Sequence, residues 1–297
     1  MAAMPRERLV ACLFVAPATA VLGVFVAWPA LYMAWASLHE GAWSQTTGQT
    51  FAGLASYRAL LTDRAFGQAA ANTAWFTVLV VPLQTALALA FAVWTNRPGK
   101  AVRFLRMAVF VPTTLSLAVL SVVWSLLYAP ATATGAGLFN GLLSGVGLPV
   151  QPFLASPRQA LLAIVAMSVW QGVGLQMMVF LSGLQQIPEQ LYEAARLDGA
   201  GRWQQLRHIT LPALAPTTLF VVMITTIFAL KLFVQPLLMT GGGPEGATRS
   251  VVQYVYEAAF HSRDLSLACA AGVVFLVAVL VIAAGQRYAG RRAEDWQ

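Results

Sequence analysis

Charged residues are scarce in this sequence of 297 residues, of which Asp, Glu, Lys and Arg together make up 10%. Soluble globular proteins contain about 25% of these residues. Apolar residues make up 59% of the chain. So few charges among so many apolar side chains predict a polytopic membrane protein with no room for a separate soluble domain.

Lysine is rarer still, since Lys100 and Lys231 are the only two in the sequence. Neither lysine completes the phosphate-binding pattern Gly, four residues, Gly-Lys-Ser/Thr. We therefore expect that the chain does not hydrolyse ATP at a Walker site, is not itself an enzyme and carries no cofactor. If the chain belongs to an active transporter, ATP and Mg²⁺ have to be bound by separate subunits.

Metal-binding and disulfide patterns are also missing. The two cysteines, Cys12 and Cys269, both lie in apolar runs, where a thiol acts as a small apolar side chain. The three histidines are scattered at His39, His208 and His261, without the spacing of metal ligands. We therefore expect no disulfide and no metal site.

Long apolar runs, in contrast, are abundant. Each is long enough to cross a hydrocarbon core of about 30 Å. The first run is far longer than the apolar region of a signal peptide, which has about 7–15 residues, so we interpret it as a retained membrane anchor. The sequence thus predicts an all-α integral membrane protein with one membrane domain over 1–297. Its six predicted transmembrane helices cover about 9–38, 71–95, 104–128, 160–183, 213–240 and 266–286.

The basic residues predict the orientation of these spans. If the N-terminus is inside, the eighteen Lys and Arg residues divide as twelve inside, five outside and Lys231 within a span. Basic residues favour the cytosolic side, so both termini and the 184–212 loop are predicted to be cytosolic. The net charge of +7 then reflects orientation and anionic lipid in the bilayer, and we expect no nucleic-acid partner.

The 184–212 loop has the pattern of two short helices joined by glycine. Pro188 suits a first helical turn, and Ile187, Leu191 and Ala194 recur at helical spacing on one face. Gly199 can adopt the left-handed backbone angles that end such a helix. The loop therefore predicts a compact amphipathic elbow at the membrane surface. An ordinary connector that covers lipid headgroups is the alternative.

The same loop contains Glu193-Ala194-Ala195, then Gly199 after three residues, and Ile209-Thr210-Leu211-Pro212 after nine more. This spacing resembles the EAA loop of permease subunits of binding-protein-dependent ABC importers, and every position of that pattern is matched. The run from Tyr192 to Ala200 resembles the carbohydrate branch, as in the permeases for maltose and glycerol 3-phosphate.

Other segments strengthen the resemblance, which covers nearly the whole chain. Asn72-Thr73, Arg103-Phe104-Leu105-Arg106 with Pro112, and Thr240-Gly241-Gly242-Gly243-Pro244 match that branch in order. The resemblance implies a type I ABC importer permease fold whose cytosolic EAA loop couples to an ATPase. It implies a multi-pass location in the bacterial inner membrane. The implied partners are a second permease, usually a different homologous chain, two ATP-binding subunits and an extracytoplasmic solute-binding protein.

The resemblance also assigns residues to the ATPase-docking loop. Its docking helix and elbow would contain Glu193, Ala194, Ala195, Asp198 and Gly199. Its attachment to the fifth span would contain Ile209, Leu211 and Pro212.

Candidates for the solute pathway come from polar residues inside the predicted spans, where they are costly and face protein or water. In the fourth span, Ser168 and Gln171 lie one turn apart, whereas Gln176 is expected to point elsewhere. A small polar stripe in the third span, from Thr114 to Ser125, is more typical of close helix packing than of solute contact.

Lys231 and Gln235 are predicted to lie one turn apart near the outer end of the fifth span. The lysine either lines the pathway or extends to the interface, and the sequence leaves both alternatives open. The family commonly has an aspartate three residues after this lysine, where this chain has Val234.

Together these patterns favour a permease subunit of an ATP-driven importer for a sugar or sugar-like solute. A passive channel or ion-coupled carrier is the alternative, but it typically needs carboxylates in the membrane, and all eleven acids fall in predicted loops or tails. A membrane enzyme would need a catalytic cluster that the sequence does not contain. The sequence does not distinguish a neutral sugar from a sugar phosphate.

Overall fold

The computed structural model of the chain describes residues 6–40, 50–130 and 137–294. The described residues are largely helical, and the only strands among them, β1 (His39–Glu40) and β2 (Thr50–Phe51), pair antiparallel. The predicted all-α class is therefore confirmed. The chain forms two compact units, built from 1–63 with 255–277 and from 64–254 with 278–297. The ends that are predicted to be cytosolic, 1–5 and 295–297, lie outside the described residues.

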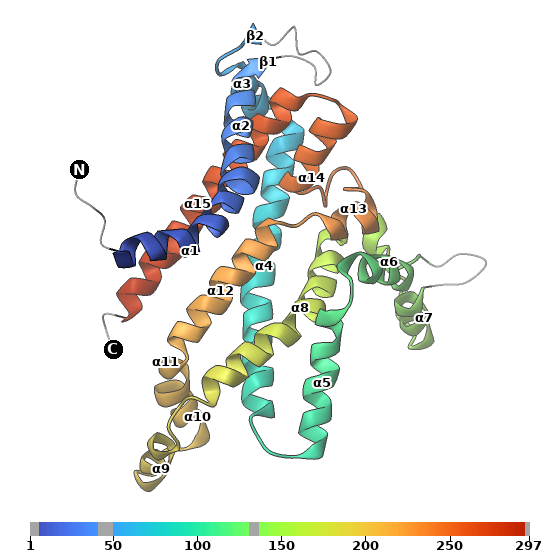
Figure 1. Ribbon diagram of the computed structural model, residues 1–297. Helices are drawn as coiled ribbons and strands as arrows, with labels where there is room; N and C mark the ends of the chain where they lie inside the picture. The colour runs from blue at the N-terminus through green and yellow to red at the C-terminus, as the bar shows by residue number, and fades with distance from the viewer. Residues whose placement is uncertain (1–5, 41–49, 131–136, 295–297) are drawn as a thin grey trace. The chain divides into compact units, whose positions relative to one another are not determined.

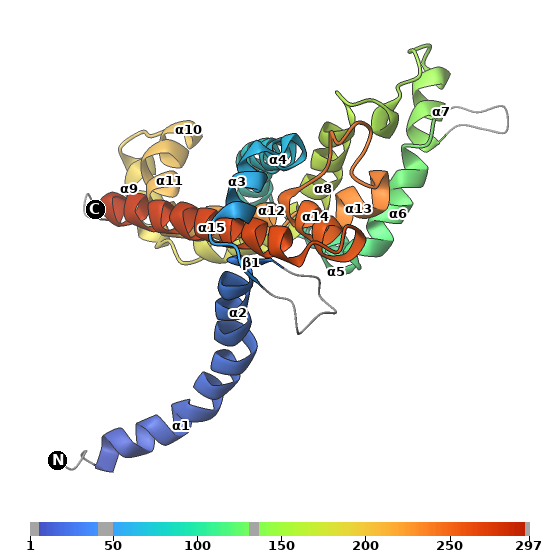
Figure 2. The same cartoon turned by 90° about the horizontal axis from the view of Figure 1, so that it is seen from above.

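The first of these units contains the first predicted span. Its helical elements before residue 63 are α1 (Arg6–Leu22), the π-helical turn η1 (Gly23–Ala27), α2 (Trp28–Ala36) and α3 (Ala55–Thr62). The first three follow one another without a break, as the curved segment in Figure 2 shows. Within them, Cys12–Ala36 is long and apolar enough to cross a membrane.

The same unit also contains η4 (Glu257–His261) and the first part of α15 (Leu265–Glu294). Gly272 lets α2 approach α15, because a Cβ at this position would lie 2.7 Å from the Met33 sulfur. The Ser266 hydroxyl donates a hydrogen bond of 2.5 Å to the backbone carbonyl of His39. These contacts join the N-terminal helices to α15.

The second unit is built on four long helices: α4 (Arg64–Thr95), α5 (Lys100–Thr114), α8 (Ala160–Leu184) and α12 (Ala215–Leu230). Helix α4 packs against α8 and α12, and α5 packs against α8 (Figure 1). Small residues allow this close packing. Ala88 and Ala92 are fully buried, and a Cβ at Gly174 would lie 2.2 Å from the backbone oxygen of Val109 on α5.

The third predicted span is broken. Helix α5 ends at Thr114, and α6 (Leu117–Leu127) leaves at an angle of 102°. Leu115 and Ser116 between them have extended backbone angles. Pro112 contributes to the break, because it has no N–H for the last turns of α5. The prediction of one continuous helix over 104–128 is therefore wrong.

The fifth predicted span is bent at its start. The segment Arg202–Ala213 and α12 meet at an angle of 65°. Leu214 lies at the bend, and Pro216 occupies the first turn of the new helix. The segment before the bend consists of α10 (Arg202–Gln205), η3 (Leu206–Thr210) and α11 (Leu211–Ala213).

The fifth predicted span is also interrupted near its end, so its prediction as one helix over 213–240 is wrong. Helix α12 ends at Leu230, and α13 (Val234–Thr240) begins after three residues outside both helices. The Ser250 hydroxyl donates a hydrogen bond to the backbone carbonyl of Leu232 in this gap. That bond satisfies a carbonyl group that the helix no longer pairs.

Four helices of the described chain are therefore long and apolar enough to cross a membrane, and six if each bent pair counts as one span. The extent of the membrane domain stays a prediction. The remaining helical elements are α7 (Leu138–Gly145), η2 (Phe153–Ala155), α9 (Glu189–Leu197) and α14 (Val251–Tyr256). Helices α9 and α10 lie at the opposite end of the second unit from α6, α7 and α13 (Figure 1).

The glycine-rich segment after α13 is attached to the first half of α4. The Asn72 amide donates hydrogen bonds to the backbone carbonyls of Gly246 (2.8 Å) and Arg249 (3.0 Å). The Gln68 amide donates to the carbonyl of Glu245 at 2.9 Å. Two side chains of one helix thus hold the backbone of the 241–250 segment.

Candidate functional site

The segment 188–213, here called the elbow segment, has the predicted helix, glycine elbow and helix. Helix α9 ends at Leu197, and Gly199 follows with a φ of +78°. This left-handed geometry confirms the predicted glycine turn. The Ala200 N–H bonds to the Ala195 carbonyl at 2.8 Å, and the Gln204 side chain accepts the Gly201 N–H at 2.7 Å. Both turns are thus closed by local hydrogen bonds.

The elbow segment exposes large apolar side chains among charged and polar ones. No residue of α9 is buried. Glu193 and Ala194 are exposed, as are Asp198 and Gly199, and Ala195 is partly buried. Leu197 is 90% exposed and Trp203 is 70% exposed. Leu197 and Trp203 offer apolar surface that another molecule could cover.

The elbow segment is connected to the long helices by a polar contact and a buried side chain. The hydroxyl groups of Tyr192 on α9 and Thr210 on η3 are 3.0 Å apart. Four residues later, Leu214 is 1% exposed and packs in the apolar core with Phe180 and Leu181 of α8. The hydroxyl contact and the buried Leu214 thus link α9 to the bend before α12.

The predicted attachment residues lie in this connection. Ile209 ends the π-helical turn with Thr210, and Leu211 and Pro212 begin the three-residue α11. Pro212 lies before the bend at Leu214, and α12 begins after that bend. The hydrogen-bond contact between the hydroxyl groups of Tyr192 and Thr210 was not predicted, although both residues lie within the segment that resembles the EAA loop.

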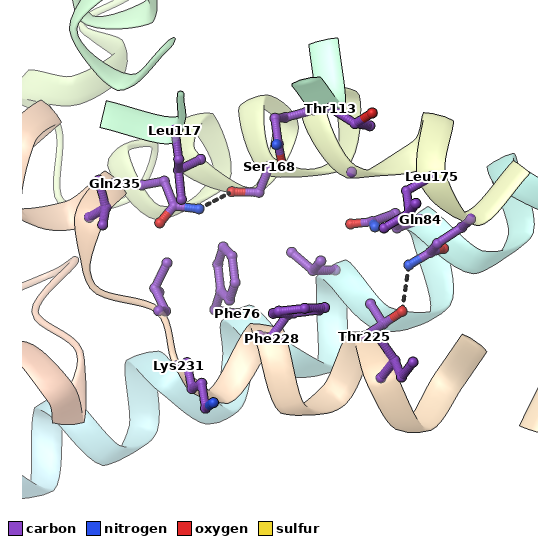
Figure 3. A pocket seen from close by; sticks show the side chains of 18 residues that line it. Phe76, Gln84, Thr113, Leu117, Ser168, Leu175, Thr225, Phe228, Lys231 and Gln235 are labelled. Atoms are coloured by element: carbon purple, nitrogen blue, oxygen red, sulfur yellow. Dashed lines mark hydrogen bonds between the residues drawn. The ribbon is translucent and has the colours of Figure 1, made fainter. Parts of the chain in front are cut away.

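A cavity of about 360 Å³ lies among α4, α5, α8 and α12, with α6 and α13 closing one end. Figure 3 shows its lining. All four residues predicted for the pathway line it, namely Ser168, Gln171, Lys231 and Gln235. The structure therefore brings these residues together, although they come from three different helical elements or their ends.

At one end of the cavity, the Gln235 amide donates a hydrogen bond of 3.4 Å to the Ser168 hydroxyl. Ser168 in turn donates to the Ile164 carbonyl at 2.7 Å. Lys231 is the C-cap residue of α12, whereas Gln235 belongs to α13. The expectation that the two residues lie one turn apart on one helix is therefore wrong. In Figure 3 the lysine lies across the cavity from Ser168 and Gln235, with Phe76 between them.

At the other end of the cavity, Gln176 was expected to point elsewhere and instead forms part of the lining. Its amide nitrogen donates a hydrogen bond to the Thr225 hydroxyl on α12. Its amide oxygen is buried without a hydrogen-bond partner among the described residues. Such an acceptor is costly unless a ligand or water occupies it.

Gln84 on α4 is a further lining residue that the sequence prediction missed. It approaches α8 at Gly172, where an added Cβ would lie 2.4 Å from the Gln84 amide nitrogen. The predicted stripe in the third span does not contribute, since Thr114 and Ser121 bond to carbonyls of their own helices and neither lines the cavity. From this region Thr113 lines it instead.

The cavity lining combines apolar and polar side chains and is almost free of charge. Four glutamine amides line it, and Lys231 is its one charged lining residue. No acidic side chain lines it. In the described part of the chain, no group of three or more His, Cys, Asp or Glu residues could hold a metal ion. The arrangement is suited to hydrogen bonding with a polar solute and offers no acid–base pair for catalysis.

Residues 84–295 match the family model described as "Binding-protein-dependent transport system inner membrane component". The chain is 33% identical to the probable ABC transporter permease protein YurN of Bacillus subtilis, covering 93% of this chain and 94% of that protein. It is 33% identical to the trehalose/maltose transport system permease protein MalF of Thermococcus litoralis, covering 93% and 91%.

Its identity to the sn-glycerol-3-phosphate transport system permease protein UgpA of Agrobacterium fabrum is 31%, covering 94% of each chain. Among solved structures, a chain of a bacterial ABC transporter involved in the import of alginate has the same fold. The TM-score is 0.82 at 23% identity, covering 97% of this chain and 96% of that one. A second structure of an alginate transporter contains a pentasaccharide-bound periplasmic protein.

Proposed function

Since the chain belongs to the family of binding-protein-dependent transport system inner membrane components, we propose that it forms half of the pathway of an importer for sugars or sugar-like solutes. The chain is a permease subunit of this family. The substrate class rests on the cavity in the second unit and on the relatives, which include trehalose/maltose and glycerol 3-phosphate permeases.

One observation carries the proposal: polar residues of α4, α8, α12 and α13 line a single cavity that has no acidic side chain. Its volume of about 360 Å³ falls within the range of small-molecule sites, which is about 300–1,000 Å³. Amide groups both donate and accept hydrogen bonds, as sugar hydroxyls require. Phe76 and Phe228 add apolar faces for a sugar ring, and the unpaired Gln176 oxygen supplies an acceptor.

The elbow segment is the proposed contact with an ATP-binding subunit. Its exposed Leu197 and Trp203 would enter a cleft of that subunit, with Glu193, Ala194 and Ala195 on the docking helix. Movement of α9 would pass through the Tyr192–Thr210 contact to the bend at Leu214. The long helices would then change between inward-open and outward-open arrangements by rigid-body motion.

The complete importer would contain a second permease, two ATP-binding subunits that bind ATP and Mg²⁺, and an external solute-binding protein. A homologous but different chain is the proposed second permease. The proposed location is the bacterial inner membrane with both termini in the cytosol. In this assembly the chain holds no cofactor of its own.

Deletion and complementation test the proposal. Cells that lack this chain should lose uptake of one solute from a radiolabelled panel of maltose, trehalose, lactose and glycerol 3-phosphate. Plasmid-borne chain should restore that uptake, and depletion of ATP should abolish it again. Unchanged uptake of the whole panel would contradict the substrate class. Uptake that ignores ATP and follows an ion gradient would favour a carrier instead.

A further inference from the structure

A second pocket, outside the central cavity, lies where α4 ends and α5 begins. It has a volume of about 350 Å³, and its polar lining includes Asn96, Arg97, Arg103, Arg106 and Gln185. We call it the arginine pocket. No acidic side chain lines it. Three guanidinium groups around one space repel one another, so the pocket favours an anion.

The three arginines differ in how far the protein already uses them. Arg106 is partly buried and donates hydrogen bonds to the carbonyls of Thr95 (3.2 Å from Nε) and Arg97 (3.3 Å from Nη2). It thereby holds the end of α4 and has a structural role. Arg97 and Arg103 are exposed, and their guanidinium groups make no hydrogen bond or ion pair within the described chain. These two side chains remain available to a ligand.

The donor set points to phosphate as the anion. A guanidinium group binds phosphate through two parallel N–H donors, and two such groups can clamp one phosphate. The side-chain amides of Asn96 and Gln185 add neutral donors at the same pocket. The glycine turn at Gly99, with a φ of +148°, brings the two flanking arginine segments to one site.

An apolar stripe extends from the pocket along α5. Arg103, Met107 and Val111 are four residues apart, so they follow one face of the helix, and Phe104 lies beside them. Phe104 is 70% exposed, Met107 53% and Val111 51%. A free phosphate ion would leave this stripe uncovered. A phospholipid would cover it with an acyl chain while its phosphate occupied the pocket.

We propose that the arginine pocket binds the headgroup phosphate of an anionic phospholipid whose acyl chain lies along Phe104, Met107 and Val111. On the predicted topology the pocket faces the cytosolic leaflet, where anionic lipids attract basic segments. The lipid occupies the corner between α4 and α5. It covers a charged surface that no other part of the described chain neutralises.

Native mass spectrometry of the purified full complex tests this site. The complex is loaded from nanodiscs of phosphatidylcholine with a minor fraction of phosphatidylglycerol, and retained phosphatidylglycerol is counted. The double variant R97Q/R103Q should reduce retention about 25-fold, because each arginine near an anionic lipid contributes a factor of about five. The matched control R58Q/R158Q removes two exposed arginines elsewhere and should retain the lipid.

Two further measurements distinguish a lipid phosphate from a free phosphate ion. The charge-conserving variant R97K/R103K should retain part of the lipid and verifies folding, because lysine keeps the charge but loses the bidentate geometry. Inorganic phosphate should not displace phosphatidylglycerol from the unmodified complex. Displacement by phosphate would identify a free-ion site, and equal losses in the control would identify non-specific charge attraction. Either result would overturn the proposal. A photo-crosslinker placed at Met107 should react with lipid, and a crosslink to another protein subunit would also overturn the proposal.

Discussion

The missing side chain at Gly172 gives Gln84 access to the cavity. The Gln84 amide nitrogen occupies the space beside α8 that a Cβ at Gly172 would take, 2.4 Å away. Gln84 itself is buried, so few other side-chain conformations are open to its amide group. The identity of residue 172 therefore determines where a neighbouring polar group stands in the cavity.

Gly172→Ala should weaken solute transport by displacing the Gln84 amide. We expect the half-saturating solute concentration to rise about fivefold, which corresponds to one neutral hydrogen bond of about 1 kcal/mol. The measurement is initial uptake rate against solute concentration in reconstituted vesicles. Gly67→Ala, on the same helix as Gln84 and with nothing within 4 Å of the new Cβ, is the matched control. Equal kinetics in both variants would remove Gln84 from the solute contacts.

Sequence reasoning located part of this cavity and missed the rest for identifiable reasons. Ser168 and Gln171 were found because polar residues inside an apolar run are costly. Gln84 obeys the same rule in the second span and could have been found with it. Gln176 was assigned to another direction because a single helix face was considered, whereas helices on several sides of α8 enclose the cavity. Only the tertiary arrangement shows that.

Among the elements, the elbow segment was predictable and the breaks were not. Gly199 and the helical spacing before it are local signals, and they suffice to place α9 and its turn. The gap after Leu230 is supported by Ser250, which lies eighteen residues along the chain from Leu232. A hydropathy pattern contains no information about such a contact. It therefore merges α12 and α13 into one span.

Gly199→Val should uncouple ATP hydrolysis from transport by distorting the elbow segment. A β-branched residue resists the left-handed angles at this position, at a cost of about 1–2 kcal/mol. We expect reduced pull-down of the ATP-binding subunit and uptake lowered several-fold, with normal insertion into the membrane. Both quantities are measured on the same vesicle preparation.

Gly201→Ala is the control for that variant, since Gly201 has a φ of −71° and its added Cβ would meet nothing closer than 3.7 Å. This neighbouring substitution should leave coupling unchanged. If Gly199→Val behaved like the control, the elbow segment would be an interfacial connector without a mechanical role.

On the scale of the whole molecule, orientation in the membrane was predicted from charge alone, and the fold is compatible with either direction. Arg158 precedes α8, whereas Gln190 lies on α9 after the same helix. One membrane-spanning helix thus separates two exposed positions. The predicted topology places Gln190 in the cytosol and Arg158 outside.

Cysteine labelling checks this orientation. In a background with Cys12→Ala and Cys269→Ala, Arg158→Cys should react with a membrane-impermeant maleimide in intact cells, and Gln190→Cys should react only after lysis. This difference is expected because a charged reagent does not cross the hydrocarbon core of the membrane. Labelling of Gln190→Cys in intact cells would reverse the topology and move the elbow segment away from any cytosolic ATPase.

The attachment of the 241–250 segment to α4 has a consequence for how this protein can diverge. Asn72 and Gln68 donate hydrogen bonds to the carbonyl groups of Glu245, Gly246 and Arg249, so only backbone atoms of the segment take part in the attachment. Substitutions that keep the backbone path therefore leave the attachment intact, whereas an insertion or deletion shifts every carbonyl out of register. The length of the segment is therefore fixed, whereas its side chains can vary where they have no contact of their own. Gly246 and Ser250 are exceptions, because an added Cβ at Gly246 would lie 2.9 Å from the Gln68 side chain and the Ser250 hydroxyl bonds to Leu232.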